Sequence, residues 1–387
     1  MEGSDCRSET GVPQAMSTLA TNAITDASGG NTATINSYTP TESNMAGRNK
    51  IINGDMRIDQ RNAGASSSTG ASFIGYVTVD RWAIGANENL GTIQQVSDAP
   101  VGFVQSTKIT VTGTTTAGAN NYGTFCQRVE GNNIADFGWG TSSAKTATIS
   151  FWVKASISGT YAGYVYNNSY NYCFNFSYSV NSTNTWEYKT ITIIAPTTGS
   201  FPTGTSYGVE VGFVLYAGSA YRGTANTWNA ANYIVAPTGS ITYPFQNNGM
   251  TIQWTGVQLE AGSVATPFEH RMYGQELALC QRYYQKISAS SGGGYQIYAT
   301  GTYESAATLW VNVPLKVTMR AQPTFASNGS IATSYGTAGT LVTDTNQTGP
   351  DIGVFGWTNG SGGLAGSATF VRSNANTAGF ISFIAEL

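Results

Sequence analysis

Short stretches in which every second residue is apolar recur through much of this 387-residue chain. Residues 146–154 (TATISFWVK) place Ala, Ile, Phe and Val on one face, and residues 209–215 repeat the pattern. Residues 188–194 (YKTITII) form a third such stretch. Alternation with a period of two predicts strands, and segments rich in Gly, Asn, Ser and Thr separate them. The sequence therefore predicts an all-β protein, with a β-sandwich or jelly roll over residues 49–272.

One of these predicted strands changes the face of its apolar residues part-way along. In residues 251–259 (TIQWTGVQL), Ile252 and Trp254 share one face, while Val257 and Leu259 have the opposite parity. A β-bulge inserts one extra residue and restores a single apolar face. We expect such a bulge at Thr255-Gly256.

After residue 270 the apolar period changes from two to a mixture of three and four. Residues 271–286 read RMYGQELALCQRYYQK. Five residues of this region are separated by 4, 3, 4 and 3 positions, which is the spacing of a heptad repeat: Tyr273, Leu277, Cys280, Tyr284 and Ile287. This predicts a short helix, over residues 273–287, with two interpretations. It is an axial helix that joins three subunits, with Tyr273, Leu277, Cys280 and Tyr284 on the trimer axis, or it lies on the core of its own domain.

The chain divides into four parts by composition. Residues 1–48 are polar and too poor in large apolar side chains to form a core alone. The jelly roll over 49–272 and the helix with its Gly/Ser linker over 273–290 follow. Residues 291–387 contain further alternating stretches, such as 295–303 and 307–313. We expect this last part to be a small β-sandwich at the tip of the molecule.

Charged residues are scarce, which narrows the possible functions. Asp, Glu, Lys and Arg make up 10% of the chain, and there is one histidine, whereas soluble domains carry roughly 25% charged residues. The net charge is −3, so binding of nucleic acid by phosphate neutralisation is not expected. Groups for acid–base catalysis are few. We expect neither an enzyme nor a cofactor.

The individual candidates for catalysis or metal binding give the same expectation. His270 lies between two charged residues and no GxSxG motif is present, so we interpret it as a structural residue. An acidic patch alternates with arginines and predicts ion pairs between strands: Asp55, Asp59 and Asp80 with Arg57, Arg61 and Arg81. The four cysteines, which are widely spaced, predict free thiols and no zinc site: Cys6, Cys126, Cys173 and Cys280. Neither a secretory signal nor an apolar run of the ~18 residues needed to cross a membrane is found.

Aromatic residues are the stronger candidates for binding. Residues 161–178 (YAGYVYNNSYNYCFNFSY) contain six tyrosines, and a strand would place Tyr164 with Tyr166 and Tyr170 with Tyr172. Tyrosine rings offer an apolar face and a polar edge to sugars, but they equally serve a core or a subunit contact. Near the end of the chain, three aromatic residues in segments rich in Gly and Asn are candidates for exposed binding loops: Tyr335, Phe355 and Trp357.

Several segments together resemble a family of phage virion fibre proteins. They are KIINGDMRIDQ at 50–60, followed by Asp80-Arg81-Trp82, then ISFWVKAS at 149–156, and TGVQLEAGSVATPFEHRMYGQELALCQRYY at 255–284. The resemblance covers roughly residues 16–287. It implies a homotrimer that assembles in the host cytoplasm and is located on the surface of the virion.

The central domain is also similar to carbohydrate-binding modules with a jelly-roll fold. Such modules often open with Asn-Gly-Asp-aromatic-Glu and hold a structural calcium ion between the first and last strands. Arg57 stands where that Glu would be, and the closing strand (WTGVQLE) has no Asp. We therefore expect no metal, and we expect Arg57 or Arg81 to replace the ion by pairing with Glu260.

The function that this resemblance implies is adhesion without catalysis. Residues 16–48 would bind another virion protein, and a tail fibre would bind a glycan or protein of the host surface through its tip or its tyrosine patch. A capsid-attached fibre or decoration protein shares every feature above, and a polysaccharide-degrading tailspike is a further alternative. A secreted carbohydrate-binding module is disfavoured by the missing signal sequence. The molecule is not expected to insert into a membrane.

Overall fold

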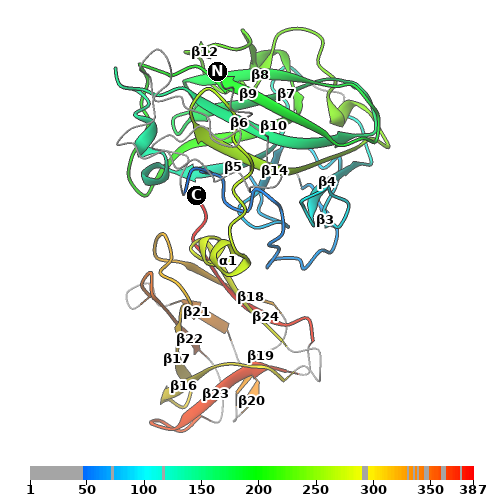
Figure 1. The fold of residues 1–387 in the computed structure, drawn as a ribbon. Helices are drawn as coiled ribbons and strands as arrows, with labels where there is room; N and C mark the ends of the chain where they lie inside the picture. The colour runs from blue at the N-terminus through cyan, green and yellow to red at the C-terminus, as the bar shows by residue number, and fades with distance from the viewer. Residues whose placement is uncertain are drawn as a thin grey trace, which may run out of the picture.

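The fold is all-β, as the sequence predicts, with one α-helix in the part of the chain that the structure covers. The computed structural model describes residues 47–70, 74–115, 118–289, 295–328, 331–333, 336–337, 340–343, 348–358, 363–374 and 377–387. The predicted virion-attachment segment up to residue 46, Cys6, Tyr335 and most of the Gly/Ser linker lie outside these residues. Figure 1 shows a larger β-sandwich above and a smaller β unit below, with the helix between them.

The first sheet of the sandwich has six antiparallel strands in the order β1-β3-β4-β14-β6-β9. Their bounds are β1 Ser67–Ser68, β3 Gly91–Val96, β4 Ser106–Val111, β14 Thr251–Ala261, β6 Ala147–Ala155 and β9 Glu187–Ile193. The predicted bulge in β14 is confirmed. The pairing of β14 with β6 shifts between Thr255 and Gln258, and Gly256 there has a φ of 61°, which favours glycine.

The second sheet of the sandwich also has six strands, in the order β12-β8-β7-β10-β5-β2. Their bounds are β12 Trp228–Asn229, β8 Cys173–Val180, β7 Gly159–Asn167, β10 Tyr207–Ala217, β5 Tyr122–Glu130 and β2 Ala83–Ala86. Short elements flank the two sheets: strands β11 Arg222–Gly223 and β13 Ala236–Pro237, and 3-10 helices Gly131–Asn133, Ala135–Phe137, Ser219–Tyr221 and Pro244–Gln246.

Aromatic side chains join the two sheets. Phe125 of β5 stacks on Trp82 with ring centroids 4.8 Å apart, and Phe213 of β10 stacks on Trp254 of β14 at 5.1 Å. Phe151 of β6 meets Phe213 edge-on at 4.8 Å. All five rings are buried. Since each lies on the alternating apolar face of its strand or next to it, the period-two pattern of the sequence places the core between the sheets.

The helix is shorter than predicted. α1 covers Tyr273–Gln281, and the chain then forms strand β15, Tyr284–Ser288. Tyr284 pairs with Ile384 and Ile287 with Ile381 of strand β24, Phe380–Ile384. The heptad spacing therefore continues beyond the helix by coincidence, because pairing with a strand from the far end of the chain determines the structure of residues 284–288.

The C-terminal unit contains two sheets. A three-stranded sheet has the order β15-β24-β18, with β18 at Thr324–Asn328. A seven-stranded sheet has the order β20-β19-β23-β16-β17-β22-β21. Its bounds are β20 Gly336–Thr337, β19 Ile331–Thr333, β23 Ala368–Ser373, β16 Ile297–Ser305, β17 Thr308–Pro314, β22 Ile352–Thr358 and β21 Thr340–Thr343. A separate core that includes Val311, Val371, Ile381 and Phe383 holds the two sheets together.

The two units meet at a third, smaller apolar cluster. It contains Ile52, Ile58, Cys280 and Tyr283, with Leu277, Leu279 and Leu387 packed against it. After β24 the chain turns back toward the sandwich, as the end marked in Figure 1 shows, and there the Glu386 carboxylate accepts hydrogen bonds from Arg61 and Arg81. The last residues of the sequence thus contribute to the junction.

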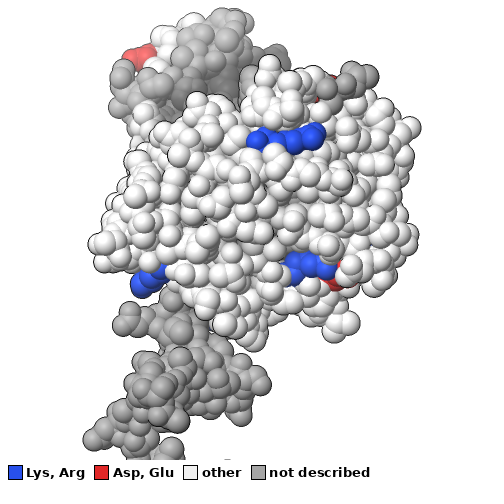
Figure 2. Space-filling view, turned by 90° about the horizontal axis from the view of Figure 1, so that it is seen from above, with Lys and Arg blue, Asp and Glu red and all other residues white. Residues whose placement is uncertain are grey.

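Charges are sparse on one face of the molecule as well as in the sequence. The face of the molecule in Figure 2 shows a few scattered Lys, Arg, Asp and Glu side chains among neutral ones. No helix in the described ranges is both long and apolar enough to span a membrane.

Candidate functional site

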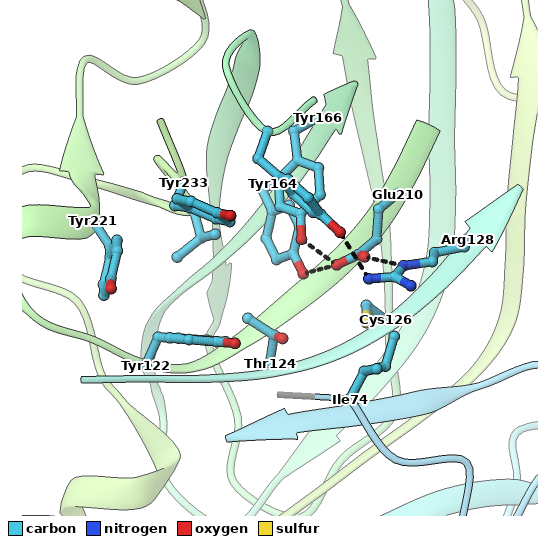
Figure 3. Close-up of a pocket in the computed structure, with 12 residues that line it drawn as sticks. Ile74, Tyr122, Thr124, Cys126, Arg128, Tyr164, Tyr166, Glu210, Tyr221 and Tyr233 are labelled. Carbon is cyan, nitrogen blue, oxygen red and sulfur yellow. Dashed lines mark hydrogen bonds and ion pairs between the residues drawn. The ribbon is translucent and has the colours of Figure 1, made fainter. Parts of the chain in front are cut away.

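A cavity lies on the face of the second sheet that points away from the sandwich core. Along β5, Phe125 points into the core, so Thr124 and Arg128 point to the opposite face. Glu210 of β10 does the same between two core valines. The cavity has a volume of about 180 Å³. Its lining comes from the sheet and from neighbouring loops: Ile74, Tyr122, Thr124, Cys126, Arg128, Tyr164, Tyr166, Tyr170, Glu210, Tyr221, Tyr233 and Val235. We call it the tyrosine cavity (Figure 3).

A carboxylate organises the floor of the tyrosine cavity. Tyr164 and Tyr166 of β7 donate their phenol protons to Oε1 of Glu210 over 2.7 and 2.6 Å. Arg128 of β5 donates from Nε to Oε2 of Glu210 over 2.9 Å. Figure 3 shows these three side chains converging on Glu210. Hydrogen bonds to an ionised acceptor are stronger than neutral ones, so this network fixes the positions of both tyrosines.

The pKa values of these groups keep the network in one protonation state. Burial, together with the charge of Glu210, raises the pKa of Tyr164 and of Tyr166 well above the usual value. Burial opposes the charge of Arg128, but the nearby Glu210 carboxylate outweighs it and raises the pKa of Arg128. Both phenols therefore keep their protons and donate them over the physiological pH range.

Two tyrosines at the rim hold strained backbone conformations. Tyr170 and Tyr233 have φ values of 59° and 57°, in the left-handed region that large side chains seldom adopt. Their rings stack on each other with centroids 4.8 Å apart. Tyr170 also accepts a hydrogen bond from Nη2 of Arg128 over 3.0 Å. Strained residues of this kind often lie at binding and active sites, and two of the eight non-glycine residues with positive φ in the described part of the chain meet at this rim.

The cavity brings together three of the four tyrosines named from the sequence. Tyr164, Tyr166 and Tyr170 line it. Tyr172 does not, because it lies beyond the end of β7 in the turn before β8 and stacks on Trp228 with ring centroids 5.2 Å apart. The expectation that Tyr170 and Tyr172 share a face along a strand is wrong, since the chain turns after Asn167.

The candidates in the C-terminal unit have a different outcome. Phe355 and Trp357 belong to strand β22, paired with Val311 and Leu309 of β17, and not to loops as expected. Tyr335 lies outside the described residues. The Gly and Asn residues around them favour a loop, but the backbone of this segment pairs with β17 and forms a strand.

The trimer-axis candidates do not form one exposed stripe. Cys280 is fully buried and Tyr284 nearly so, both within this single chain. Leu277 packs against the junction cluster, and Tyr273 is the exposed member, at 57%. The prediction that Cys280 and Tyr284 lie at a contact between subunits is wrong, because their own chain already covers them. Through Cys280 and Leu277 the helix packs on its own chain, as the second interpretation predicts, and a contact between subunits through Tyr273 stays a prediction.

The expected replacement of a calcium ion is also wrong. Arg57 pairs with Asp55, Nε to Oδ2 at 2.8 Å, and Arg81 pairs with Glu386. Glu260 instead accepts hydrogen bonds from Gln258 and Thr266. In the described part of the chain, no three His, Cys, Asp or Glu side chains gather as they would to hold a metal ion.

The acidic patch is only partly an ion-pair network. Asp55 pairs with Arg57, but Asp59 accepts hydrogen bonds from the backbone nitrogens of residues 62 and 64. Asp80 accepts hydrogen bonds from Gln60. The arginines at 61 and 81 turn instead to Glu386, which lies 305 residues or more away in sequence. His270 is exposed and packs beside Phe103 and Phe268.

Several residues of the cavity were not anticipated from the sequence. Glu210 and Arg128 come from β10 and β5, which are neighbours in space but 82 residues apart in sequence. Tyr122, Tyr221 and Tyr233 come from other segments again. A signal existed for Glu210: it is the one charged residue in the eleven-residue strand YGVEVGFVLYA, opposite in parity to the core valines.

No protein-family model matches the sequence, and a search of curated proteins finds no relative. Solved structures similar to part of the chain include the enzymatically active domain of tailspike protein 4 from bacteriophage CBA120. That match has a TM-score of 0.31 and 14% identity, and covers 56% of this chain and 22% of the other. A family 4 carbohydrate-binding module matches at 0.26 with 16% identity, covering 54% and 98%. The family 11 carbohydrate-binding module of a Clostridium thermocellum cellulase matches at 0.26 with 14% identity, covering 55% and 100%.

Proposed function

We propose that this chain binds a glycan through the tyrosine cavity and does not cleave it. The observation that carries this proposal is the cavity itself: about 180 Å³ of space lined by six tyrosines around one buried carboxylate. Ligand sites of this kind combine apolar or aromatic walls with a few fixed polar groups. A sugar ring has an apolar face and a polar edge, and a tyrosine side chain offers both complements.

The chemistry of the floor supports binding over catalysis. Hydrolysis of a glycosidic bond generally requires two carboxyl groups across the bond. Among the residues that line the cavity, Glu210 is the one carboxylate, and it already holds three hydrogen bonds from Tyr164, Tyr166 and Arg128. A carboxylate held in this way is suited to orient its neighbours and is poorly placed to act as a base.

The proposed setting is a fibre on a phage particle. The support is the sequence resemblance over residues 16–287, together with the low charge and the β-sandwich fold. In this setting residues 16–48 anchor the chain to another virion protein, and three copies act together. Three weak sites on one rigid trimer raise avidity by roughly 10² to 10⁴ over a single site. A capsid-attached fibre would use the same cavity at another place on the particle.

Two experiments test the proposal. A glycan array probed with the purified full chain should show binding to one class of bacterial surface sugar, and a reducing-sugar assay on the same glycan should show no product. Light scattering should give three times the chain mass of 40.8 kDa. Absence of all glycan binding would overturn the proposed function, and sustained product release would replace it with that of a tailspike enzyme. Cryo-EM of the intact particle separates tail from capsid attachment.

A further inference from the structure

The phenol protons of Tyr164 and Tyr166 are already committed to Glu210, and this limits what the floor of the tyrosine cavity can offer a ligand. Tyr164 and Tyr166 both point their hydroxyl protons at Oε1 of Glu210. Each phenol oxygen has a single proton, so neither can donate to a second partner. What these oxygens still offer to the cavity is lone pairs, because a hydroxyl oxygen has two acceptor positions.

The neighbouring Arg128 extends this arrangement. Each nitrogen of Arg128 donates to a protein oxygen: Nε to Glu210, Nη2 to Tyr170 and Nη1 to the carbonyl of Leu387 at 2.7 Å.

The oxygen of Tyr166 is the most available acceptor. Its side chain lines the cavity and is 7% exposed. Among the described residues, Glu210 is the one hydrogen-bond partner of the Tyr166 hydroxyl. A buried acceptor with an open lone pair favours a ligand that brings a donor, because an unmatched polar group is costly in a site shielded from water.

The size of the cavity limits how much of a ligand enters. A cavity of about 150 Å³ holds a benzene ring, and this one measures about 180 Å³. One six-membered ring fits into this volume and a second does not. The sheet closes the floor, and the stacked rings of Tyr170 and Tyr233 stand at the rim. A glycan would therefore enter by its end.

We propose that the tyrosine cavity recognises the terminal ring of a glycan by the protons of its free hydroxyl groups, with Tyr166 as a specificity-determining acceptor. This inference rests on the proposed function and adds to it a ligand class, namely chain ends whose hydroxyls are unsubstituted. Sugars that carry acetyl, methyl or phosphate groups at these hydroxyls lack the protons that the floor requires.

The test compares ligands that differ in a donor but not in size. The probes are maltotriose, cellotriose, β-1,4-galactotriose and a β-linked N-acetylglucosamine trimer, together with any trisaccharide that the array identifies. Each is used unmodified and with single hydroxyls of the terminal ring replaced by fluorine, which removes the proton with little change in volume. With the wild-type chain, at least one replacement should weaken binding by about 3- to 10-fold, the effect of one hydrogen bond. Lengthening the glycan beyond the trisaccharide should not strengthen binding further.

The Tyr166→Phe variant assigns that hydrogen bond to its acceptor. It keeps the ring and removes the oxygen, so the unmodified sugar should bind as weakly as the fluorinated one, and the difference between the two ligands should vanish. Tyr188→Phe is the matched control, since Tyr188 lies in β9 of the other sheet and is 43% exposed. Thermal unfolding of each variant separates loss of binding from loss of the fold.

The outcomes distinguish this inference from the proposed function. Binding of unmodified sugars that no fluorine replacement weakens would overturn the inference and leave glycan binding in place, as would an undiminished ligand difference in Tyr166→Phe. If the Tyr166→Phe variant does not fold, the comparison of unmodified and fluorinated sugars with the wild-type chain still tests whether hydroxyl protons contribute to binding. If neither the array nor any trisaccharide binds at all, the proposed function fails, and the inference with it.

Discussion

Two buried clusters of arginine and glutamate can be compared within this molecule. In the tyrosine cavity, Arg128 pairs with Glu210, whose side chain is 3% exposed. At the junction between the two units, Arg81 and Arg61 pair with Glu386, and the Arg81 side chain is 1% exposed. Both clusters place a guanidinium over a tyrosine ring, which lowers the cost of burying the charge.

The clusters differ in what lies beside them. At the junction, the Arg81 guanidinium lies 3.5 Å from the ring centroid of Tyr283, which belongs to the apolar junction cluster. In the tyrosine cavity, the phenol oxygens bound to Glu210 border an open volume. A buried ion pair is therefore structural in one place and positions ligand-facing groups in the other. Burial alone does not distinguish these roles, whereas adjacent free volume does.

The largest expected effect is at the junction. Glu386→Gln leaves Arg81 and Arg61 without their carboxylate, and an uncompensated buried charge costs about 3–5 kcal/mol of the free energy of unfolding. Urea denaturation measures this loss. The control is Asp136→Asn, which breaks the Lys50–Asp136 pair whose carboxylate is 41% exposed, with an expected loss of about 0–1 kcal/mol. Equal losses in the two variants would show that the junction cluster has no special structural role.

The next effect is at the floor of the tyrosine cavity. Glu210→Gln should lower the free energy of unfolding by about 2–3 kcal/mol, less than at the junction because the Arg128 side chain is 15% exposed and reaches water. It should also weaken glycan binding, because a glutamine amide has one acceptor oxygen and one NH2 donor in place of the two carboxylate oxygens, so it cannot accept hydrogen bonds from Arg128 and from the pair Tyr164 and Tyr166 at once. Glu386→Gln provides the comparison. If Glu210→Gln binds glycan normally while folded, the two clusters have the same, purely structural role.

A third prediction uses pH to sharpen the description of the junction. Burial raises the pKa of Asp80 from 3.8 to about 7, while hydrogen bonds from Gln60 oppose the rise. Between about pH 4 and 7 the folded state keeps a proton that the unfolded chain has released. The Asp80 contribution therefore makes the free energy of unfolding decrease as pH rises through this window, and the cost is complete above pH 7.

Replacing Asp80 with Asn removes that proton and the associated slope. We compare the free energy of unfolding of Asp80→Asn with that of the wild type at two pH values. The difference, variant minus wild type, should be more favourable to the variant at pH 7.5 than at pH 4.5, by on the order of 2 kcal/mol. Urea denaturation at the two pH values measures this. Asp55, whose pKa burial raises to about 6, contributes a slope of the same sign in both proteins. Parallel stability curves for the two proteins would contradict the prediction.

The sequence predicted the parts of the fold that depend on local pattern. The alternation in β6, β10 and β14 identified their core faces, and the change of parity at Thr255-Gly256 predicted the bulge. The helix was predicted too long because Tyr284 and Ile287 continue the spacing but pair with β24, about one hundred residues later. A strand partner at that distance leaves no trace in a local window.

The site was predictable to a similar extent. Three of its tyrosines lie within seven residues of one another, and their density marked them as candidates. Glu210 and Arg128 come from other strands, and the order of strands in the sheet, which the sequence does not reveal, brings them together. Tyr233 comes from a turn between β12 and β13. An isolated charge inside an apolar strand, such as Glu210, is the feature that could have indicated them in a chain with few charges.

The smallest expected effect tests whether the two clusters are independent. They share Arg128: Arg81 donates to its carbonyl at 2.7 Å, and its own Nη1 donates to the carbonyl of Leu387, next to Glu386. Distant sites add within about 0.5 kcal/mol, whereas sites in one network do not. In a double-mutant cycle of Glu210→Gln and Glu386→Gln, we therefore expect a coupling of about 0.5–1 kcal/mol.

The sign of that coupling follows from the geometry. Once Glu386→Gln has loosened the segment that ends at Leu387, Arg128 can turn toward water, so the further loss caused by Glu210→Gln becomes smaller. The double variant should thus be more stable than the sum of the single losses predicts. Urea denaturation of the four proteins under one condition gives the coupling directly. Strict additivity would mean that the bond between Arg128 and Leu387 transmits nothing, and that the binding floor is independent of the junction.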